Sequence, residues 1–67
     1  MQVGDMIKFG HVYNGCDLNG QLAVYLGEAF IHRDDGVTVE NHKVLLIGAT
    51  KTTIIDRSLV RYMRIQG

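Results

Sequence analysis

The chain has 67 residues, the length of one small domain. Seven Lys and Arg residues balance seven Asp and Glu residues, and 46% of the residues are hydrophobic, so the composition excludes a disordered chain and one that attracts nucleic acid by net charge alone. A single cysteine excludes an internal disulfide and a four-cysteine zinc site, and no apolar run reaches the ~18 residues of a membrane span.

Turn signals divide the first third of the chain. Residues 6–9 (Met-Ile-Lys-Phe) are the first predicted strand. Residues 10–20 contain two Asn-Gly dipeptides, which favour turns. We therefore expect a long loop between the first and second strands, or a ragged hairpin arm.

The middle of the chain predicts a β-hairpin. Residues 21–33 and 37–47 are typical of strands, and residues 34–36 (Asp-Asp-Gly) are typical of the turn that joins them. A two-residue turn sets the following register: Val24 opposite Ile47, Leu26 opposite Leu45, and Glu28 opposite Lys43. A three-residue turn shifts these pairs, and both registers stay open. Gly27 and Gly48 permit bulges or sharp bends.

The second half of the chain is rich in strand-favouring residues, since eleven of the 24 residues 37–60 are Val, Ile or Thr. Residues 51–55 are the next predicted strand, and residues 62–65 are the last. Between them, Asp56 and Ser58 offer capping groups for one short helical turn. Five short strands joined by tight turns predict an all-β fold, a small five-stranded barrel that forms a single domain over residues 1–67.

Several segments resemble SH3-like small barrels. Residues 3–9 resemble their first strand, and residues 53–60 followed by 63–65 resemble their closing strand, tight helical turn and final strand. Residues 20–25 and 46–48 are similar to motifs of the Sm-like variant of this barrel. The whole chain resembles small barrel proteins encoded by tailed phages, including those of marine cyanobacteria. The resemblance implies a barrel that forms rings by pairing its edge strands.

The chain departs from the Sm family at the RNA pocket. That pocket uses an Asp and an Asn in the first motif and an Arg before the glycine of the second. Here the matching positions hold Leu26, then Ala29 or Phe30, and Ile47. The resemblance therefore implies the barrel and the ring, and it does not imply the uridine site of that family.

Charge is distributed unevenly along the chain. Residues 1–47 hold three basic and six acidic residues, a net charge of −3, whereas residues 48–67 hold four basic residues and one acidic, a net charge of +3. Arginines around an aromatic ring suit phosphate pairing and base stacking. The candidate nucleic-acid-binding residues are Lys51, Arg57, Arg61, Tyr62 and Arg64. The alternative is that these charges meet acidic surfaces of other subunits, or are only solvated.

We expect neither a metal site nor an active site. The register with the two-residue turn puts His32 and His42 on opposite faces of the hairpin, where they cannot share an ion. Ser58 suits a cap better than a nucleophile, and Cys16 has no activating base that the sequence fixes. The prediction is a protein without cofactor and without enzymatic activity.

The leading interpretation is an oligomeric barrel that binds RNA or DNA through the basic C-terminal patch. The rival is a protein–protein adaptor or a phage structural component whose charges serve subunit contacts. The apolar segments 44–47 and 52–55 lack a gatekeeping proline, so pairing of such edges between copies favours a homo-oligomer. The first residues lack the features of a signal peptide, so we expect a protein that contacts no membrane and resides in the cytoplasm, the host's if a phage encodes it.

Overall fold

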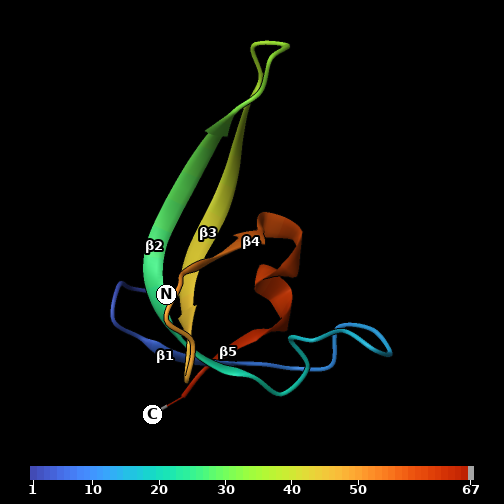
Figure 1. The fold of residues 1–67 in the computed structure, drawn as a ribbon, viewed down its shortest axis with the longest axis vertical. Helices are drawn as coiled ribbons and strands as arrows, with labels where there is room; N and C mark the ends of the chain where they lie inside the picture. The colour runs from blue at the N-terminus through green and yellow to red at the C-terminus, as the bar shows by residue number, and fades with distance from the viewer. Residues whose placement is uncertain (67) are drawn as a thin grey trace.

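The computed structural model describes residues 1–66 and has five strands in one antiparallel sheet (Figure 1). Its elements are β1 (Met6–Phe9), β2 (Leu22–His32), β3 (Thr38–Leu46), β4 (Thr53–Asp56), the 3₁₀ helix η1 (Arg57–Tyr62) and β5 (Met63–Ile65). The strand order is β4-β3-β2-β1-β5. The predicted all-β class, the five strands and the short helical turn before the last strand are confirmed. No helix in residues 1–66 is long and apolar enough to cross a membrane.

The segment between β1 and β2 is a loop, as one of the two sequence interpretations expected. Its shape is fixed by Asn19, whose side-chain Oδ1 accepts a hydrogen bond from the Val12 N–H at 2.8 Å. The amide Nδ2 of the same side chain donates to the Tyr13 carbonyl at 2.8 Å. One asparagine therefore satisfies backbone groups that no strand pairs.

The hydrophobic core lies on one face of the sheet and receives side chains from all five strands. Its buried members are Ile7, Phe9, Ala23, Tyr25, Val44, Ile55 and Met63. Leu59 and Val60 of η1 pack against this core and cover part of it. In β2, Ala23 and Tyr25 face the core, while Leu22 on the opposite face remains 42% exposed. Val24, two residues further along the strand, shares this outer face.

The hairpin register expected from a two-residue turn is wrong, and the three-residue turn is the one that forms. The Arg33 N–H donates to the Val37 carbonyl at 2.8 Å, and the Gly36 N–H donates to the Arg33 carbonyl at 3.1 Å. Accordingly Val24 lies opposite Leu45, and Glu28 lies opposite His42. A two-residue turn of the type that suits hairpins needs a positive φ at Asp35. In this turn only Gly36, at φ +86°, has one.

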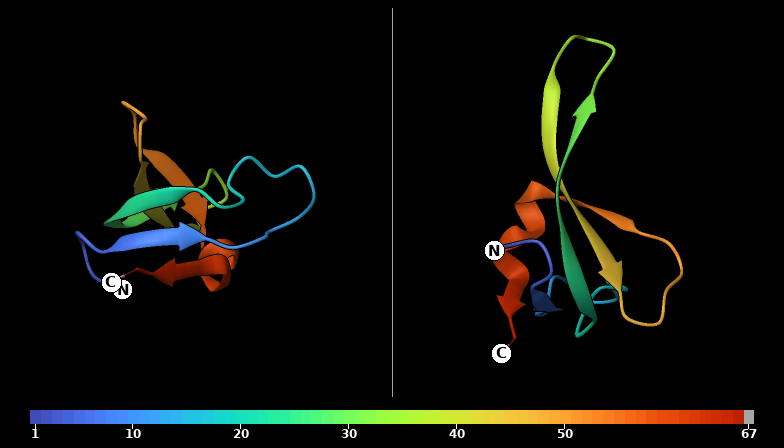
Figure 2. Two further views of the ribbon diagram at one scale, coloured as in Figure 1. Left: turned by 90° about the horizontal axis from the view of Figure 1, so that it is seen from below. Right: turned by 90° about the vertical axis from the view of Figure 1, so that its left-hand side faces the viewer.

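A β-bulge interrupts β2 between Tyr25 and Gly27, as the glycine at position 27 permitted. Gly27 has φ +116°, a backbone conformation that residues with a side chain rarely adopt. A Cβ there would lie 3.4 Å from Cγ2 of Val3. Beyond the bulge, the hairpin leaves β1 behind, and its residues 27–43 form an arm whose outer part, residues 30–40, is two-stranded (Figures 1 and 2). The bulge therefore separates the packed sheet from the projecting arm.

Replacing Gly27 with Ala is expected to lower the free energy of unfolding by about 2 kcal/mol, because the new side chain is strained at this φ. Gly36→Asn is the matched control, since Asn tolerates a left-handed turn position and a Cβ at Gly36 has nothing within 4 Å. We expect the control to change stability by less than about 0.5 kcal/mol. Urea unfolding measures both values, and equal losses would contradict the role given to the bulge.

Candidate nucleic-acid interface

Four of the five predicted site residues lie on consecutive elements near the C-terminal end. Arg57, Arg61 and Tyr62 belong to η1, and Arg64 belongs to β5. Lys51 lies apart from them, in the connection between β3 and β4. The 3₁₀ helix exposes its arginines because Leu59 and Val60 turn toward the core.

Three of these residues form a cluster, which we call the arginine cluster: Arg61, Tyr62 and Arg64. The guanidinium carbon of Arg61 lies 5.0 Å from the centre of the Tyr62 ring, a cation–π contact. Nη1 of Arg64 donates to the carbonyl oxygen of Arg61 at 2.7 Å. The Tyr62 carbonyl in turn accepts a hydrogen bond from the Gly10 N–H at 2.7 Å, so the cluster is attached to the end of β1.

Lys51 and Arg57 are exposed and stand outside this cluster. No hydrogen bond between residues 1–66 joins either side chain to Arg61, Tyr62 or Arg64. The structure therefore brings together three of the five predicted residues and leaves two as separate charges on the surface.

The cations of the predicted site are not neutralised by carboxylates within the described part of the chain. Of residues 1–66, Arg33 forms an ion pair with Asp35 at 3.2 Å, and Nε2 of His42 lies 4.0 Å from a carboxylate oxygen of Glu40, both on the hairpin. No side-chain carboxylate in the same range lies within 4.0 Å of a charged nitrogen of Lys51, Arg57, Arg61 or Arg64. Most of their hydrogen-bond donors thus remain available for an anion.

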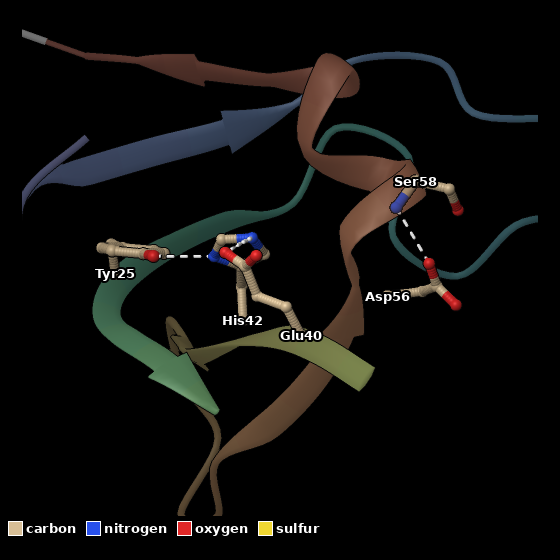
Figure 3. A network of polar contacts seen from close by, with 5 residues as sticks. All are labelled: Tyr25, Glu40, His42, Asp56 and Ser58. Carbon is tan, nitrogen blue, oxygen red and sulfur yellow. Dashed lines mark hydrogen bonds and ion pairs between the residues drawn. The ribbon is translucent and has the colours of Figure 1, made fainter. Parts of the chain in front are cut away.

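Asp56 fixes the start of η1 and hence the direction in which its arginines project. Its carboxylate accepts a hydrogen bond from the Ser58 N–H at 2.9 Å, which is the geometry of a helix N-cap (Figure 3). Hydrogen bonds from the backbone and the side chain of Ser58 lower the pKa of Asp56, because they favour the charged carboxylate. The predicted capping role of Asp56 is confirmed, whereas Ser58 is not a cap, since it lies inside η1 and donates its backbone N–H to Asp56.

A second polar network, which the sequence reasoning missed, lies where the arm meets the sheet (Figure 3). The Tyr25 hydroxyl lies 2.7 Å from Nδ1 of His42, and Nε2 of His42 lies 4.0 Å from a carboxylate oxygen of Glu40. Burial raises the pKa of Tyr25, and the charges of Glu28 and Glu40 add to this effect. Tyr25 and His42 are diagonal neighbours across β2 and β3, a relation that only the correct register reveals.

The prediction that His32 and His42 lie on opposite faces of the hairpin is wrong. With the observed register, His32 lies opposite Thr38, so His32 and His42 are on the same face of the arm. They are separated by four residues of β3, about 13 Å. Nδ1 of His32 is 3.0 Å from the Thr38 hydroxyl, and Nδ1 of His42 is at hydrogen-bond distance from Tyr25. Within residues 1–66, no group of three His, Cys, Asp or Glu residues is placed to hold a metal ion.

Comparisons of the chain with protein-family models, curated proteins and solved structures found no match. The function must therefore be argued from the residues of this chain and their geometry.

The cap at Asp56 predicts how stability depends on pH. The folded-state pKa is lowered, so the stabilisation is present above the ordinary value of 3.8 and is lost as the pH falls through the folded value. Asp56→Asn keeps an oxygen acceptor that does not titrate. We expect the wild-type chain to be the more stable of the two at neutral pH, and this advantage to disappear in acid. Thermal unfolding measured across this pH range tests the effect, and a difference that stays constant with pH would contradict it.

Proposed function

We propose that this protein is a non-enzymatic SH3-like or Sm-like small barrel that binds single-stranded RNA or DNA through the arginine cluster. The observation that carries the proposal is the cation–π contact of Arg61 with Tyr62, beside an Arg64 that is bonded to the same turn. Lys51 and Arg57 extend the positive surface for more distant phosphates. The chemistry of the ligand follows from these groups, which offer planar donors to phosphate oxygens and a ring to a base.

The arrangement of the cluster supports a single strand better than a duplex. Arg61 lies over Tyr62, so a base that stacks on the exposed part of this ring meets a cation beside it. Tyr62 is half-buried and held through its backbone, which reduces the entropy lost when a base stacks on it. The pair therefore acts as a small preformed platform with phosphate-binding groups next to it.

Self-association supplies the affinity that one neutral subunit lacks. In the proposed barrel, η1 connects the end strands β4 and β5, and pairing of such edges between copies forms a ring, as in the Sm-like barrels that parts of the sequence resemble. Each copy contributes one arginine cluster, and several clusters on one assembly bind one strand with a raised effective concentration. The place of action that this proposal implies is the cytoplasm, that of the host if a phage encodes the chain.

A protein–protein adaptor or phage structural component is the second candidate, and the arm is the observation that favours it. Phe30 is 58% exposed, Val37 is 50% exposed and Ile31 is 43% exposed, although all three are large and apolar. Apolar side chains gathered on a projecting element are typical of an interaction surface. In that case the arginines serve contacts between subunits, and nucleic acid has no effect on the assembly.

Replacing both Arg61 and Arg64 with Ala is expected to weaken binding of short single-stranded oligonucleotides. For the intact chain, affinity should fall steeply with salt, and the double variant should lose about 1.4 from the log–log slope, at ~0.7 for each phosphate contact. Fluorescence anisotropy with RNA and DNA oligonucleotides measures both quantities. Arg33→Ala is the control, because Arg33 is a cation at the tip of the arm, paired with Asp35.

Light scattering with and without the same oligonucleotides separates the two candidate functions. A discrete oligomer that gains mass with nucleic acid and loses it at high salt supports the binding proposal. An oligomer whose mass no oligonucleotide changes would contradict it and favour the adaptor.

Tyr62 provides a separate test of stacking. Tyr62→Leu is expected to weaken oligonucleotide binding about tenfold, since stacking on one aromatic ring contributes about 1–3 kcal/mol. Tyr62→Phe keeps the ring and should bind within about twofold of the wild-type chain. Equal binding by the two variants, with both folded by circular dichroism, would exclude a stacking role for this residue.

A further inference from the structure

One edge of the arm has no strand beside it. β1 pairs with β2 only at residues 22–24, so the part of β2 beyond Gly27 has β3 on one side and no strand of residues 1–66 on the other (Figure 2). The edge that this leaves open runs over residues 27–32, and we call it the open edge. An edge of this length is a template for pairing with another strand.

The backbone groups that the open edge presents can be identified from the ladder. Arg33 is hydrogen-bonded to Val37, and the pairs of an antiparallel ladder alternate between bonded and non-bonded. Ile31, Ala29 and Gly27 therefore direct their N–H and C=O groups toward β3. The remaining residues of the edge direct theirs outward: Glu28, Phe30 and His32.

The side chains of the open edge do not protect it. Glu28, Phe30 and His32 share one face of the arm, and all three are exposed, Phe30 by 58%. The edge has neither a lysine nor a proline, the residues that commonly block edge pairing. A two-stranded ribbon alone is marginally stable in water, so a third strand that pairs with this edge would stabilise the arm.

We propose that the open edge pairs with the same edge of a second copy of this chain, antiparallel about a two-fold axis at Phe30. In this register Glu28 lies opposite His32 of the second copy, Phe30 lies opposite Phe30, and His32 lies opposite Glu28. Each of these pairs exchanges two backbone hydrogen bonds through groups that already point outward. The contact is self-complementary, as a two-fold interface must be.

Charge selects this register among those that the backbone allows. Pairing at Phe30 sets the carboxylate of Glu28 against the imidazole of His32 twice, once on each side of the axis. A shift of two residues one way puts Glu28 opposite Asp34, which is a like-charge pair, and a shift the other way puts His32 opposite Leu26. The two phenylalanines meet only at the axis, where each covers apolar surface of the other.

The pairing leaves the arginine cluster accessible. The arm and β5 lie at opposite ends of the long axis of the molecule (Figure 1). This contact is separate from the pairing of β4 with β5 that the proposed ring uses, and it does not require nucleic acid to bind. A dimer joined through its arms carries two arginine clusters, one at each far end.

A charge exchange tests the pairing in the absence of nucleic acid. Glu28→Lys puts a cation opposite His32, and His32→Glu puts a carboxylate opposite Glu28, so each single variant should weaken self-association about tenfold. The double variant E28K/H32E sets Lys against Glu and should regain an affinity close to that of the wild-type chain. Sedimentation velocity over a range of concentrations measures the three dissociation constants.

Two controls separate the contact from general effects of the substitutions. Asp34→Lys makes the same charge change in the turn, outside the register, and Thr38→Val removes the partner of His32 on β3 while leaving the open edge intact. Both should self-associate as the wild-type chain does. A wild-type chain that stays monomeric at its highest soluble concentration would overturn the proposal. Folded single variants that associate normally, or a double variant no better than the singles, would overturn it too.

Measuring oligonucleotide binding and self-association for both the arginine-cluster variant and the open-edge variants keeps the two proposals distinguishable. Loss of nucleic-acid binding in the Arg61 and Arg64 variant, with normal self-association, supports the arginine cluster. The open edge is then judged by the sedimentation velocity of the Glu28 and His32 variants alone. Self-association through the open edge in a chain that binds no oligonucleotide would refute the proposed function and uphold the pairing.

Discussion

The bulge at Gly27 is the constraint on which the rest of the structure depends. It adds one residue to β2, and this changes which residues of β3 lie opposite it on the two sides of the bulge. On one side, Ala23 and Tyr25 enter the core. On the other side, β1 no longer accompanies β2, which is left paired with β3 alone. A single backbone conformation open to glycine thus determines both the packed part and the projecting part of the molecule.

The packed part is a sheet whose core lies on one face, and η1 is the element that covers it. Leu59 and Val60 pack against the core, and this packing leaves the arginines of the helix in solvent. The same short segment therefore contributes to stability with one side and presents charge with the other. Because Asp56 caps its start and Gly10 holds its end, the positions of these charges are determined by the fold.

Much of this architecture could be predicted from local sequence signals. The strand at residues 6–9, the cap at Asp56 and the bulge at Gly27 each follow from residues that are close together in the chain. The hairpin register could not be predicted, because the Asp-Asp-Gly turn admits two lengths that differ in the backbone conformation of Asp35. The contact of Tyr25 with His42, and the shared face of His32 and His42, depend on that register, so they could not be predicted either.

The pairing of β1 with β5 bears on the order in which the molecule assembles. The β2–β3 hairpin joins residues that are near in sequence, whereas Ile7 pairs with Ile65 across almost the whole chain. Closing so large a loop costs more entropy than closing a hairpin, so local contacts form more readily than distant ones. The three-residue β5 has few bonds with which to offset that cost. We therefore expect β5, which carries Arg64, to join the sheet last and to be released from it first.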